Sequence, residues 1–503
     1  MKHLLELLEA TAARFGPRTA LADEARALTW AEVQDTVQGI GTALGRLEVQ
    51  HRPVALYLGR GVDCPLAMLG TLAAGGFYTV LDTAQPAERV RGITGQLEPA
   101  ALVTDTEHRE AALALGLDCP VVDVAEAAAT APDPALLQRV RAEALDADPA
   151  YVLFTSGSTG LPKGVVVQHR AVLAYSAWAA STFAFDENTV LGNQTPFYFS
   201  MSVTDLYGAL RTGAQLQILP KRLFSFPVQL LDYLRQREVN TIYWVPSALG
   251  GVARWKALDY TEPPALHTIL FAGETMPTPV LNYWRARYPA ARFANLFGPT
   301  ETTDICAYYE VDRAFADDEP LPIGRACDNC GLLVLDHQNR AAAPGQTGEL
   351  CVRGSFLAAG YYNQPDKTAE RFCPNPLQPH YPETIYRTGD LVQYNERGEL
   401  MYLGRADNQI KHLGYRIEPG EIETAAYGQA GVQSCACLYD APRDRLVLFF
   451  TAGRDVTDAL RDRLADRLPA YMQPAAYRRL KTMPQNANGK IDRGALAAQL
   501  KEV

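Results

Sequence analysis

The sequence predicts an α/β protein that combines a large, layered N-terminal domain, a β-rich subdomain and a small α+β C-terminal domain. Three observations lead to this prediction. Over the first 300 residues, short apolar runs alternate with helical patterns. After about residue 322, short strands and turns follow one another. Beyond residue 405, a separate strand and helix alternation is long enough for a domain of its own.

In the N-terminal part of the chain, apolar runs alternate with helical patterns. Leu4, Leu5 and Leu8 mark an amphipathic helix at the start of the chain. Apolar runs with helical patterns between them then predict strands at 53–59, 77–82, 101–105, 214–220, 241–247, 267–274 and 291–301. Because strands that alternate with helices form crossover units, these runs predict parallel sheets.

The later elements differ in kind. Turn residues separate the apolar runs at 331–340, 348–354 and 389–405, which predicts antiparallel hairpins. The last part of the chain has strand patterns at 434–440 and 445–453 and a helical pattern at 456–468. We therefore expect a β-rich subdomain followed by a small α+β domain.

Composition excludes several classes of function. The chain has 503 residues and a net charge of −10, which argues against broad binding to nucleic acid or to an anionic membrane. Nine scattered cysteines indicate reduced thiols and a cytoplasmic protein. Cys327 and Cys330 have C-x-x-C spacing, but no second pair or histidine cluster completes a zinc site.

The stretch "TSGSTGLPKG", from Thr155 to Gly164, has the composition of a phosphate-binding loop. Its glycines leave backbone N–H groups uncovered, and Lys163 supplies one cation. It does not fit G-x-x-x-x-G-K-[ST], because Pro162 precedes the lysine. From composition alone, a phosphate cradle and an ordinary flexible connector both remain open.

Six motifs, in order, decide between these readings. They are "YVLFTSGSTGLPKGV", "NLFGPTETT", "GELCVRG", "YRTGDLV", "GRADNQIKHLGYRIEPGEIE" and "NGKIDR". From about residue 10 to 495, the chain resembles the adenylate-forming superfamily. The resemblance is strongest to amino-acid adenylation domains of nonribosomal peptide synthesis, an antibiotic-producing chemistry, and to stand-alone relatives such as D-alanine–carrier protein ligases.

The resemblance implies an activity. Such enzymes use ATP and Mg²⁺ to convert a carboxylic acid into an acyl-adenylate, which a thiol then captures. We expect a small amino acid or related acid as substrate, and the phosphopantetheine thiol of a separate carrier protein as acceptor. The alternatives are an acyl-CoA synthetase that uses free coenzyme A and a non-catalytic binding protein.

The resemblance also implies roles for residues. Thr300 would contact the α-phosphate, Glu301 would hold Mg²⁺, and Lys490 would bridge the substrate carboxylate and the α-phosphate. Nucleotide contacts are implied for Thr155, Ser156, Gly157, Ser158, Thr159, Gly160, Lys163, Asn295, Phe297, Gly298, Asp390 and Arg405. Without the family, Glu301 is a solvated loop residue, Asp390 a turn residue and Lys490 an exposed lysine.

The same comparison implies domain boundaries. Residues 1–404 would form the large domain and 409–503 a small mobile domain. The hinge would lie at 405–408, with Asp407 as its pivot, so that one active site serves both half-reactions.

The substrate pocket departs from the family pattern. Most amino-acid adenylation domains have Phe-Asp where this chain has Phe199-Ser200, and that aspartate pairs with the substrate ammonium. By alignment, the pocket comprises Ser200, Met201, Thr204, Trp244, Leu270, Ala272, Leu296, Asp304 and Ile305. These side chains predict a narrow, mostly apolar cavity for a small acid.

Ser200 carries no charge, so either the substrate lacks the ammonium group or another residue binds it. Asp304 is the one anionic residue of the predicted pocket. It could receive a displaced amine, or it could cap backbone donors after the "GPTETT" loop. We interpret the nearby Asp205 as structural.

Overall fold

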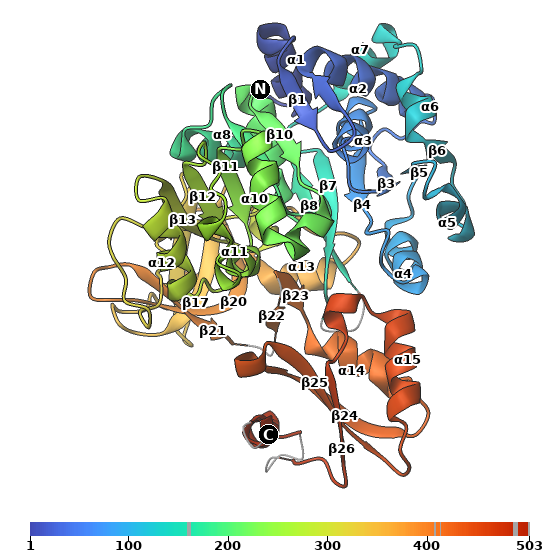
Figure 1. Cartoon of the computed structure of the whole chain (residues 1–503). Coiled ribbons are helices and arrows are strands. Elements are labelled where there is room, and N and C mark those ends of the chain that lie inside the picture. The colour runs from blue at the N-terminus through green and yellow to red at the C-terminus, as the bar shows by residue number, and fades with distance from the viewer. Residues whose placement is uncertain (158–161, 407–408, 413, 486–490, 501–503) are drawn as a thin grey trace. The chain divides into compact units, whose positions relative to one another are not determined.

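The computed structural model describes residues 1–157, 162–406, 409–412, 414–485 and 491–500. The chain divides into two compact units, coloured along the sequence in Figure 1. The core unit comprises Met1–Thr83, Leu97–Leu153 and Gly164–Ala406. The lid unit comprises Ala84–Gln96, Phe154–Lys163 and Asp407–Val503. The lid unit thus includes two segments before residue 404, and the predicted hinge at Asp407 falls outside the described residues.

The first sheet of the core unit has seven strands. In spatial order they are β18 (Gly360–Tyr361), β8 (Lys163–Gln168), β7 (Pro149–Thr155), β4 (Phe77–Val80), β3 (Pro53–Tyr57), β5 (Ala101–Thr104) and β6 (Val121–Asp123). From β7 to β6 the neighbouring strands are parallel, as the strand and helix alternation predicts.

The second sheet has nine strands. In spatial order they are β15 (Arg325–Ala326), β14 (Ala307–Glu310), β13 (Arg292–Phe297), β12 (Thr268–Phe271), β11 (Thr241–Trp244), β9 (Val190–Asn193), β10 (Gln215–Ile218), β1 (Thr19–Ala22) and β2 (Ala27–Thr29). The strands from β13 to β1 are parallel, and the outer strands pair antiparallel.

Helices complete the layers of the core unit. They are α1 (Leu5–Phe15), α2 (Trp30–Gly45), α3 (Asp63–Ala73), α5 (Arg109–Ala114), α6 (Val124–Ala128), α7 (Pro134–Glu143), α8 (His169–Phe183), α9 (Ser202–Thr212), α10 (Pro227–Gln236), α11 (Pro246–Arg254), α12 (Thr278–Arg287) and α13 (Pro365–Arg371). The prediction of a layered α/β protein is confirmed by this arrangement.

Local sequence explains where α2 begins. Thr29 accepts a hydrogen bond from the backbone N–H of Glu32, and the Glu32 side chain accepts one from the N–H of Thr29. This reciprocal cap satisfies two donors that a helix start otherwise leaves open. Next to it, buried Trp30 donates its indole N–H to the carbonyl of Gly213. The indole therefore connects the start of α2 to the end of α9.

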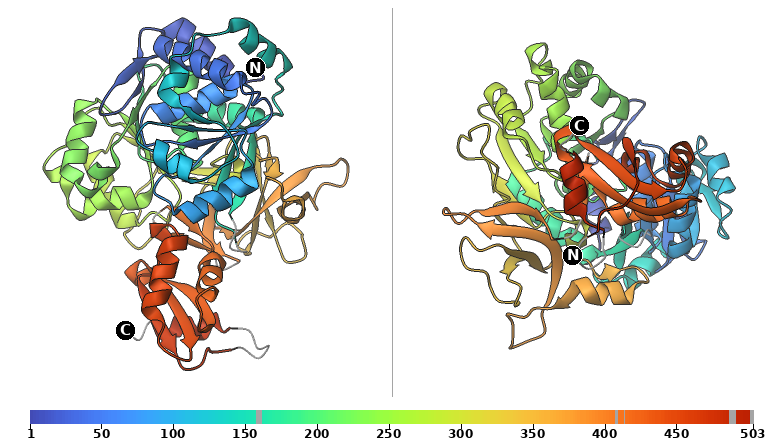
Figure 2. Two further views of the ribbon diagram at one scale, coloured as in Figure 1. Left: turned by 90° about the vertical axis from the view of Figure 1, so that its right-hand side faces the viewer. Right: turned by 90° about the horizontal axis from the view of Figure 1, so that it is seen from below.

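Two apolar clusters fill the nine-stranded sheet's two faces. The helices α10, α11 and α12 gather on one side of the core unit, where Leu231, Val252 and Trp284 join one cluster (Figure 2). Residues of α8 and α9 belong to the other cluster. Because side chains alternate along a strand, neighbouring residues of β11 and β12 enter different clusters. This alternation decides which side chains reach the site described below.

A third, antiparallel sheet completes the core unit. Its strands are β16 (Cys330–Leu335), β17 (Gly348–Gly354), β20 (Thr384–Tyr394), β19 (Phe372–Pro374) and β21 (Leu400–Arg405). All its pairings are antiparallel, which confirms the predicted β-rich subdomain.

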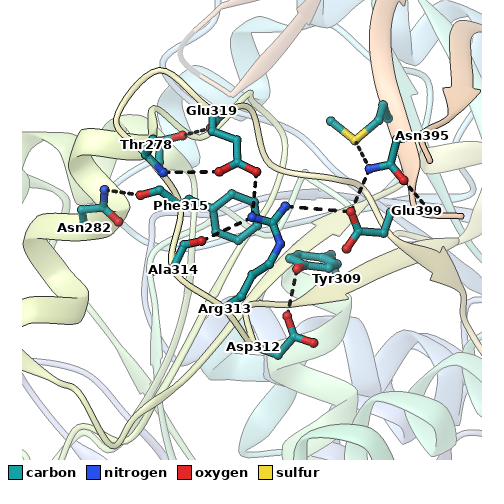
Figure 3. Close-up of polar contacts among 12 residues, drawn as sticks. Thr278, Asn282, Tyr309, Asp312, Arg313, Ala314, Phe315, Glu319, Asn395 and Glu399 are labelled. Carbon is teal, nitrogen blue, oxygen red and sulfur yellow. Dashed lines mark hydrogen bonds and ion pairs between the residues drawn. The ribbon is translucent and has the colours of Figure 1, made fainter. Parts of the chain in front are cut away.

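Polar contacts join the loop after β14 to this third sheet (Figure 3). The Arg313 guanidinium donates to Glu319 at 2.7 Å and lies 3.9 Å from a Glu399 carboxylate oxygen, close to β21. It also lies over the Phe315 ring, 3.7 Å from its centroid. The guanidinium therefore connects the loop after β14 to the turn that precedes β21.

The lid unit has its own core. Its strands are β22 (Ile410–His412), β23 (Tyr415–Ile417), β24 (Val432–Asp440), β25 (Arg445–Ala452) and β26 (Ala476–Leu480), and its helices are α4 (Ala87–Leu97), α14 (Pro419–Tyr427), α15 (Thr457–Arg467) and α16 (Arg493–Leu500). Buried Ile422, Phe450 and Leu460 belong to one apolar cluster. The mixed sheet with helices confirms the predicted α+β character.

Within the part of the chain that the structure describes, no helix combines the length and the apolar character of a membrane span.

Candidate active site

The loop after β13 carries the residues of the "GPTETT" motif. A short 3-10 helix, η3, spans Thr300–Thr302. Gly298 lies so close to the returning chain that a Cβ atom there would be 2.2 Å from the carbonyl oxygen of Asp304. Only glycine therefore allows the loop to fold back so tightly. The turn places Thr300, Glu301 and Asp304 next to one another at the carboxyl end of β13.

Glu301 is not a solvated loop residue. Its side chain is fully buried, and the Tyr361 hydroxyl donates to Oε1 at 2.8 Å. The backbone carbonyl of Glu301 accepts from the N–H of Ala358. A carboxylate held this firmly, one residue from Thr300, has the chemistry of a hard-cation ligand.

Ser200 and Asp304 meet beside Thr300. The hydroxyl oxygens of Ser200 and Thr300 are 3.4 Å apart. Ser200 also hydrogen-bonds the Asp304 carboxyl group, which lowers its pKa. The structure thus brings together a predicted phosphate contact, the residue that replaces the family aspartate, and the one acidic residue of the predicted pocket.

Three further hydroxyls converge on Oδ2 of Asp304. Tyr175 lies at 2.8 Å, Thr204 at 3.0 Å and Tyr243 at 3.2 Å. Burial raises the pKa of Asp304 to about 6, while the hydrogen bonds from Tyr175, Thr204, Tyr243 and Ser200 oppose the rise. Above this pH the carboxyl group is ionised, and the hydroxyls stabilise its charge.

Five of the predicted apolar pocket residues belong to one large apolar cluster. They come from the residue before α9, from β12 and β13 and from the loops after these two strands, and they share the cluster with Tyr175 and Tyr243: Met201, Leu270, Ala272, Leu296 and Ile305. The structure therefore brings these five predicted pocket residues into one contiguous region of the core unit.

Trp244 is placed differently from the alignment's prediction. It belongs to the opposite cluster, its indole N–H donates to the carbonyl of Gly192 at 2.9 Å, and its ring lies against Phe224. Tyr243, its neighbour on β11, faces Asp304 instead. The reason is the two-residue period of a strand, which sends adjacent side chains to opposite faces. We therefore correct this wall position from Trp244 to Tyr243.

Sequence reasoning missed Tyr175 and Tyr243. Tyr243 lies opposite Leu270 in the parallel register of β11 and β12. Because paired residues of neighbouring strands point to the same face, the predicted pocket position of Leu270 could have identified Tyr243. Tyr175 lies on α8, 129 residues before Asp304, and no motif contains it. Only the packing of α8 reveals its contact.

Asp390 and Arg405 form a second polar pair in the core unit. Arg405 Nη1 lies 3.1 Å from Asp390 Oδ1 and donates to the Thr388 carbonyl at 2.8 Å. Both side chains are largely buried. Their strands β20 and β21 pair directly, with Asp390 opposite Arg405. Asp390 is therefore a buried carboxylate on a strand rather than a turn residue.

Two predicted adenine contacts lie on β13. The Asn295 amide donates to the Pro322 carbonyl at 2.7 Å, which fixes its orientation. The Phe297 ring is mostly buried, 5.7 Å from the Tyr402 ring. These contacts orient both side chains, and their role toward adenine stays a prediction.

The predicted phosphate loop belongs to the lid unit. Thr155 ends β7, and its buried hydroxyl has no hydrogen-bond partner among the described residues. Ser156 donates to the carbonyl of Arg416 on β23, and Lys163 is buried at the start of β8. Ser158, Thr159, Gly160, Asp407 and Lys490 lie outside the described residues, and their roles, like that of Gly157, stay predictions.

Residues 8–362 match the family described as AMP-binding enzyme. The chain belongs to this family. The match confirms the predicted membership of the AMP-binding enzymes.

Relatives of this AMP-binding enzyme include synthases of nonribosomal peptides. It is 34% identical to tyrocidine synthase 3 from Brevibacillus parabrevis over 98% of its own length, but spans only 8% of that protein. It is also 33% identical to an L-proline–[L-prolyl-carrier protein] ligase from Pseudomonas fluorescens, over 99% of its own length and 100% of that protein.

Solved structures confirm the fold. An adenylation domain from Vibrio cholerae, AlmE, solved with glycyl-adenosine-5'-phosphate, superimposes with a TM-score of 0.85. The alignment covers all of this AMP-binding enzyme and 98% of that chain, at 22% identity. The acyl-adenylate synthetase fold is therefore shown for this chain.

Proposed function

We propose that this protein activates a small amino acid or amino-acid-like carboxylic acid with ATP and transfers the acyl group to the phosphopantetheine thiol of a separate carrier protein. The end-to-end match to a carrier protein ligase is the observation that supports it best. Nine free thiols suit a reducing compartment, so we propose that it acts in the cytoplasm, in the synthesis of a nonribosomal, antibiotic-type product.

The reaction has two steps. First, a carboxylate oxygen of the acid attacks the α-phosphorus of ATP, and the bond to pyrophosphate breaks. Second, the thiolate sulfur attacks the acyl carbon, and AMP leaves. Negative charge develops on the phosphate oxygens in the first step, so positioned donors and cations matter more than a general base.

Several described residues suit the first step. The Thr300 hydroxyl, 3.4 Å from Ser200, would donate to an α-phosphate oxygen beside the acid. The Asp390 carboxylate would accept the ribose hydroxyls, and Arg405 would hold that carboxylate in place. The Thr155 hydroxyl, which has no hydrogen-bond partner among the described residues, would donate to the distal phosphates together with Lys163. Lys490 would neutralise charge at the α-phosphate.

The chemistry of Glu301 fits Mg²⁺. No described cluster of three or more His, Cys, Asp or Glu side chains could hold a metal by itself. Mg²⁺ is commonly bound by one or two carboxylates together with substrate phosphates. Bound to Glu301, Mg²⁺ would neutralise the departing pyrophosphate.

Two other functions share this fold. An acyl-CoA synthetase would pass the acyl group to free coenzyme A, and a non-catalytic protein would bind nucleotide without exchange. The carrier protein ligase is favoured because a relative with that name is 33% identical over 99% of this chain. The buried, ordered Glu301 and Asp390 argue against a binding protein.

Pyrophosphate exchange separates the three functions. The protein is incubated with ATP, Mg²⁺, labelled pyrophosphate and a panel of small acids, and the acceptor thiol is then offered as a phosphopantetheinylated carrier or as coenzyme A. We expect exchange with at least one acid and faster transfer to the carrier. Equal transfer to coenzyme A would favour the synthetase, and absent exchange would favour the binding protein.

A further inference from the structure

Asp304 is a buried negative charge without a cationic partner. Its side chain is 2% exposed. Among the described residues, no Lys, Arg or His side chain forms an ion pair with it. A lone buried carboxylate costs several kcal/mol, so a fold retains one only where other groups offset the cost or a ligand uses the charge.

The hydroxyls around Asp304 are placed so that they stabilise its ionised carboxylate. Tyr175, Thr204 and Tyr243 each bring one O–H group to the same oxygen, Oδ2. Tyr175 and Thr204 are also 2.6 Å apart, and even if one proton serves that contact, two remain for Oδ2. A carboxylate oxygen that accepts several O–H donors is stabilised as an anion.

A purely local capping role does not account for these contacts. A residue that caps a loop accepts from nearby backbone N–H groups. The hydrogen bonds that Asp304 accepts come instead from side chains of α8, α9 and β11, which are 129, 100 and 61 residues away. Three elements, α8, α9 and β11, therefore hold this carboxylate in place.

The Asp304 carboxylate adjoins the reacting end of the proposed site. Ser200 lies 3.4 Å from Thr300 and also hydrogen-bonds the Asp304 carboxyl group. One small hydroxyl thus separates Thr300 from the buried charge. An ammonium group that displaces the Ser200 hydroxyl from Asp304 would remain close to Thr300, where the carboxylate of the same small acid meets the α-phosphate.

We propose that Asp304 binds the ammonium group of the substrate, in place of the aspartate that Ser200 replaces, and that Tyr175 and Tyr243 are positioning residues for it. The inference rests on the proposed adenylation function and names its substrate class. The substrate is a small carboxylic acid that carries a protonated amine. Acids that lack the amine leave the buried charge unpaired and are rejected.

The titratable neighbours agree with this assignment. In the described part of the chain, the ionisable groups that interact with Asp304 are Asp205, Cys327, Tyr151, Tyr175 and Tyr243. None of these groups supplies positive charge. The substrate ammonium would therefore bring the cation that these neighbours do not provide.

The test measures pyrophosphate exchange with acids matched except for the amine. Three sets serve: glycine, glycolate and acetate; alanine, lactate and propionate; and β-alanine, 3-hydroxypropionate and propionate. For wild-type protein we expect the amino acid of at least one set to exceed its analogues by about 100-fold in kcat/KM. In Asp304→Asn this preference should fall by about the same factor, chiefly through KM.

Asp205→Asn is the matched control. Asp205 is also buried and accepts from Asn193 rather than from the hydroxyls around Asp304. This variant should keep the amine preference within about threefold, a change smaller than the loss of one hydrogen bond. Calorimetric ATP binding by each variant reports whether the nucleotide part of the site has folded.

The outcomes are distinct. If wild-type protein exchanges equally well with acids that lack the amine, or if Asp304→Asn keeps its preference for the amino acid, the inference is wrong and the adenylation function stands. Equal loss of preference in both variants would also overturn the assignment to Asp304. If no acid supports exchange although ATP binds, the proposed function fails, and the inference fails with it.

Discussion

The Tyr243 hydroxyl lies 3.2 Å from Oδ2 of Asp304, although 61 residues separate them in the chain. Tyr243 belongs to β11, and Asp304 follows the turn after β13. The contact therefore crosses β12 at the carboxyl edge of a parallel sheet, where ligands of α/β proteins bind. The predictions below test this region and its surroundings.

Tyr243→Phe should shift the acidic limb of the pH profile of kcat/KM to higher pH. Loss of one O–H donor leaves the Asp304 anion less stabilised, so its pKa rises above the present value of about 6. The measurement is kcat/KM for the preferred amino acid across the mildly acidic to mildly basic range. We expect a decrease of about tenfold near pH 6 and a smaller one near pH 8. A uniform decrease at all pH values would contradict a positioning role.

Gly298→Ala should destabilise the core unit and abolish exchange. Its Cβ would be 2.2 Å from the Asp304 carbonyl oxygen, a backbone atom that cannot move without moving the loop. We expect a loss of about 1–3 kcal/mol in the free energy of unfolding.

Gly251→Ala on α11 is the matched control for that substitution, because a Cβ there meets no atom within 4 Å. It should leave exchange unchanged and raise helix stability slightly. Urea unfolding followed by tryptophan fluorescence measures both variants. Equal stability of the two would show that the loop after Phe297 has more room than the structure gives it.

Asp205→Asn should flatten the pH dependence of stability. Burial raises the pKa of Asp205 to about 7, against about 3.9 in an unfolded chain. Because the native state binds the proton more tightly, this group stabilises the fold fully below about pH 4, and the contribution is lost as pH rises through about 7. The wild-type free energy of unfolding should therefore fall between about pH 5 and pH 8 by about 2 kcal/mol more than that of the variant. Parallel curves would show that Asp205 keeps an ordinary pKa.

Asp390→Asn should weaken nucleotide binding more than it weakens the fold. The amide retains one acceptor oxygen, but Arg405 loses its charged partner, and the proposed ribose contact loses its anion. We expect the Kd for ATP to rise about tenfold or more, measured by isothermal titration. Arg353→Gln, which breaks the ion pair between Arg353 on β17 and Glu383 just before β20, should leave that Kd unchanged. An unaltered Kd in Asp390→Asn would remove Asp390 from the nucleotide site.

Lys490→Ala should abolish adenylation while ATP still binds, because the proposed lysine acts on charge that develops in the first step. Exchange kinetics and calorimetric ATP binding measure the two effects separately. Normal exchange by this variant would remove Lys490 from the catalytic machinery.

The sequence by itself determined the fold class, the family and the identity of the polar residues, because these depend on local patterns and motif order. Thr300, Glu301 and Asp390 could all be named from short stretches of chain. The tertiary structure alone decided which side chains meet. Strand periodicity places Tyr243 and Trp244 on opposite faces, but only the helices that cover each face determine which residue reaches Asp304. Tyr175 lies on a distant helix, and its contact with Asp304 arises from packing across 129 residues, a separation that no local pattern encodes.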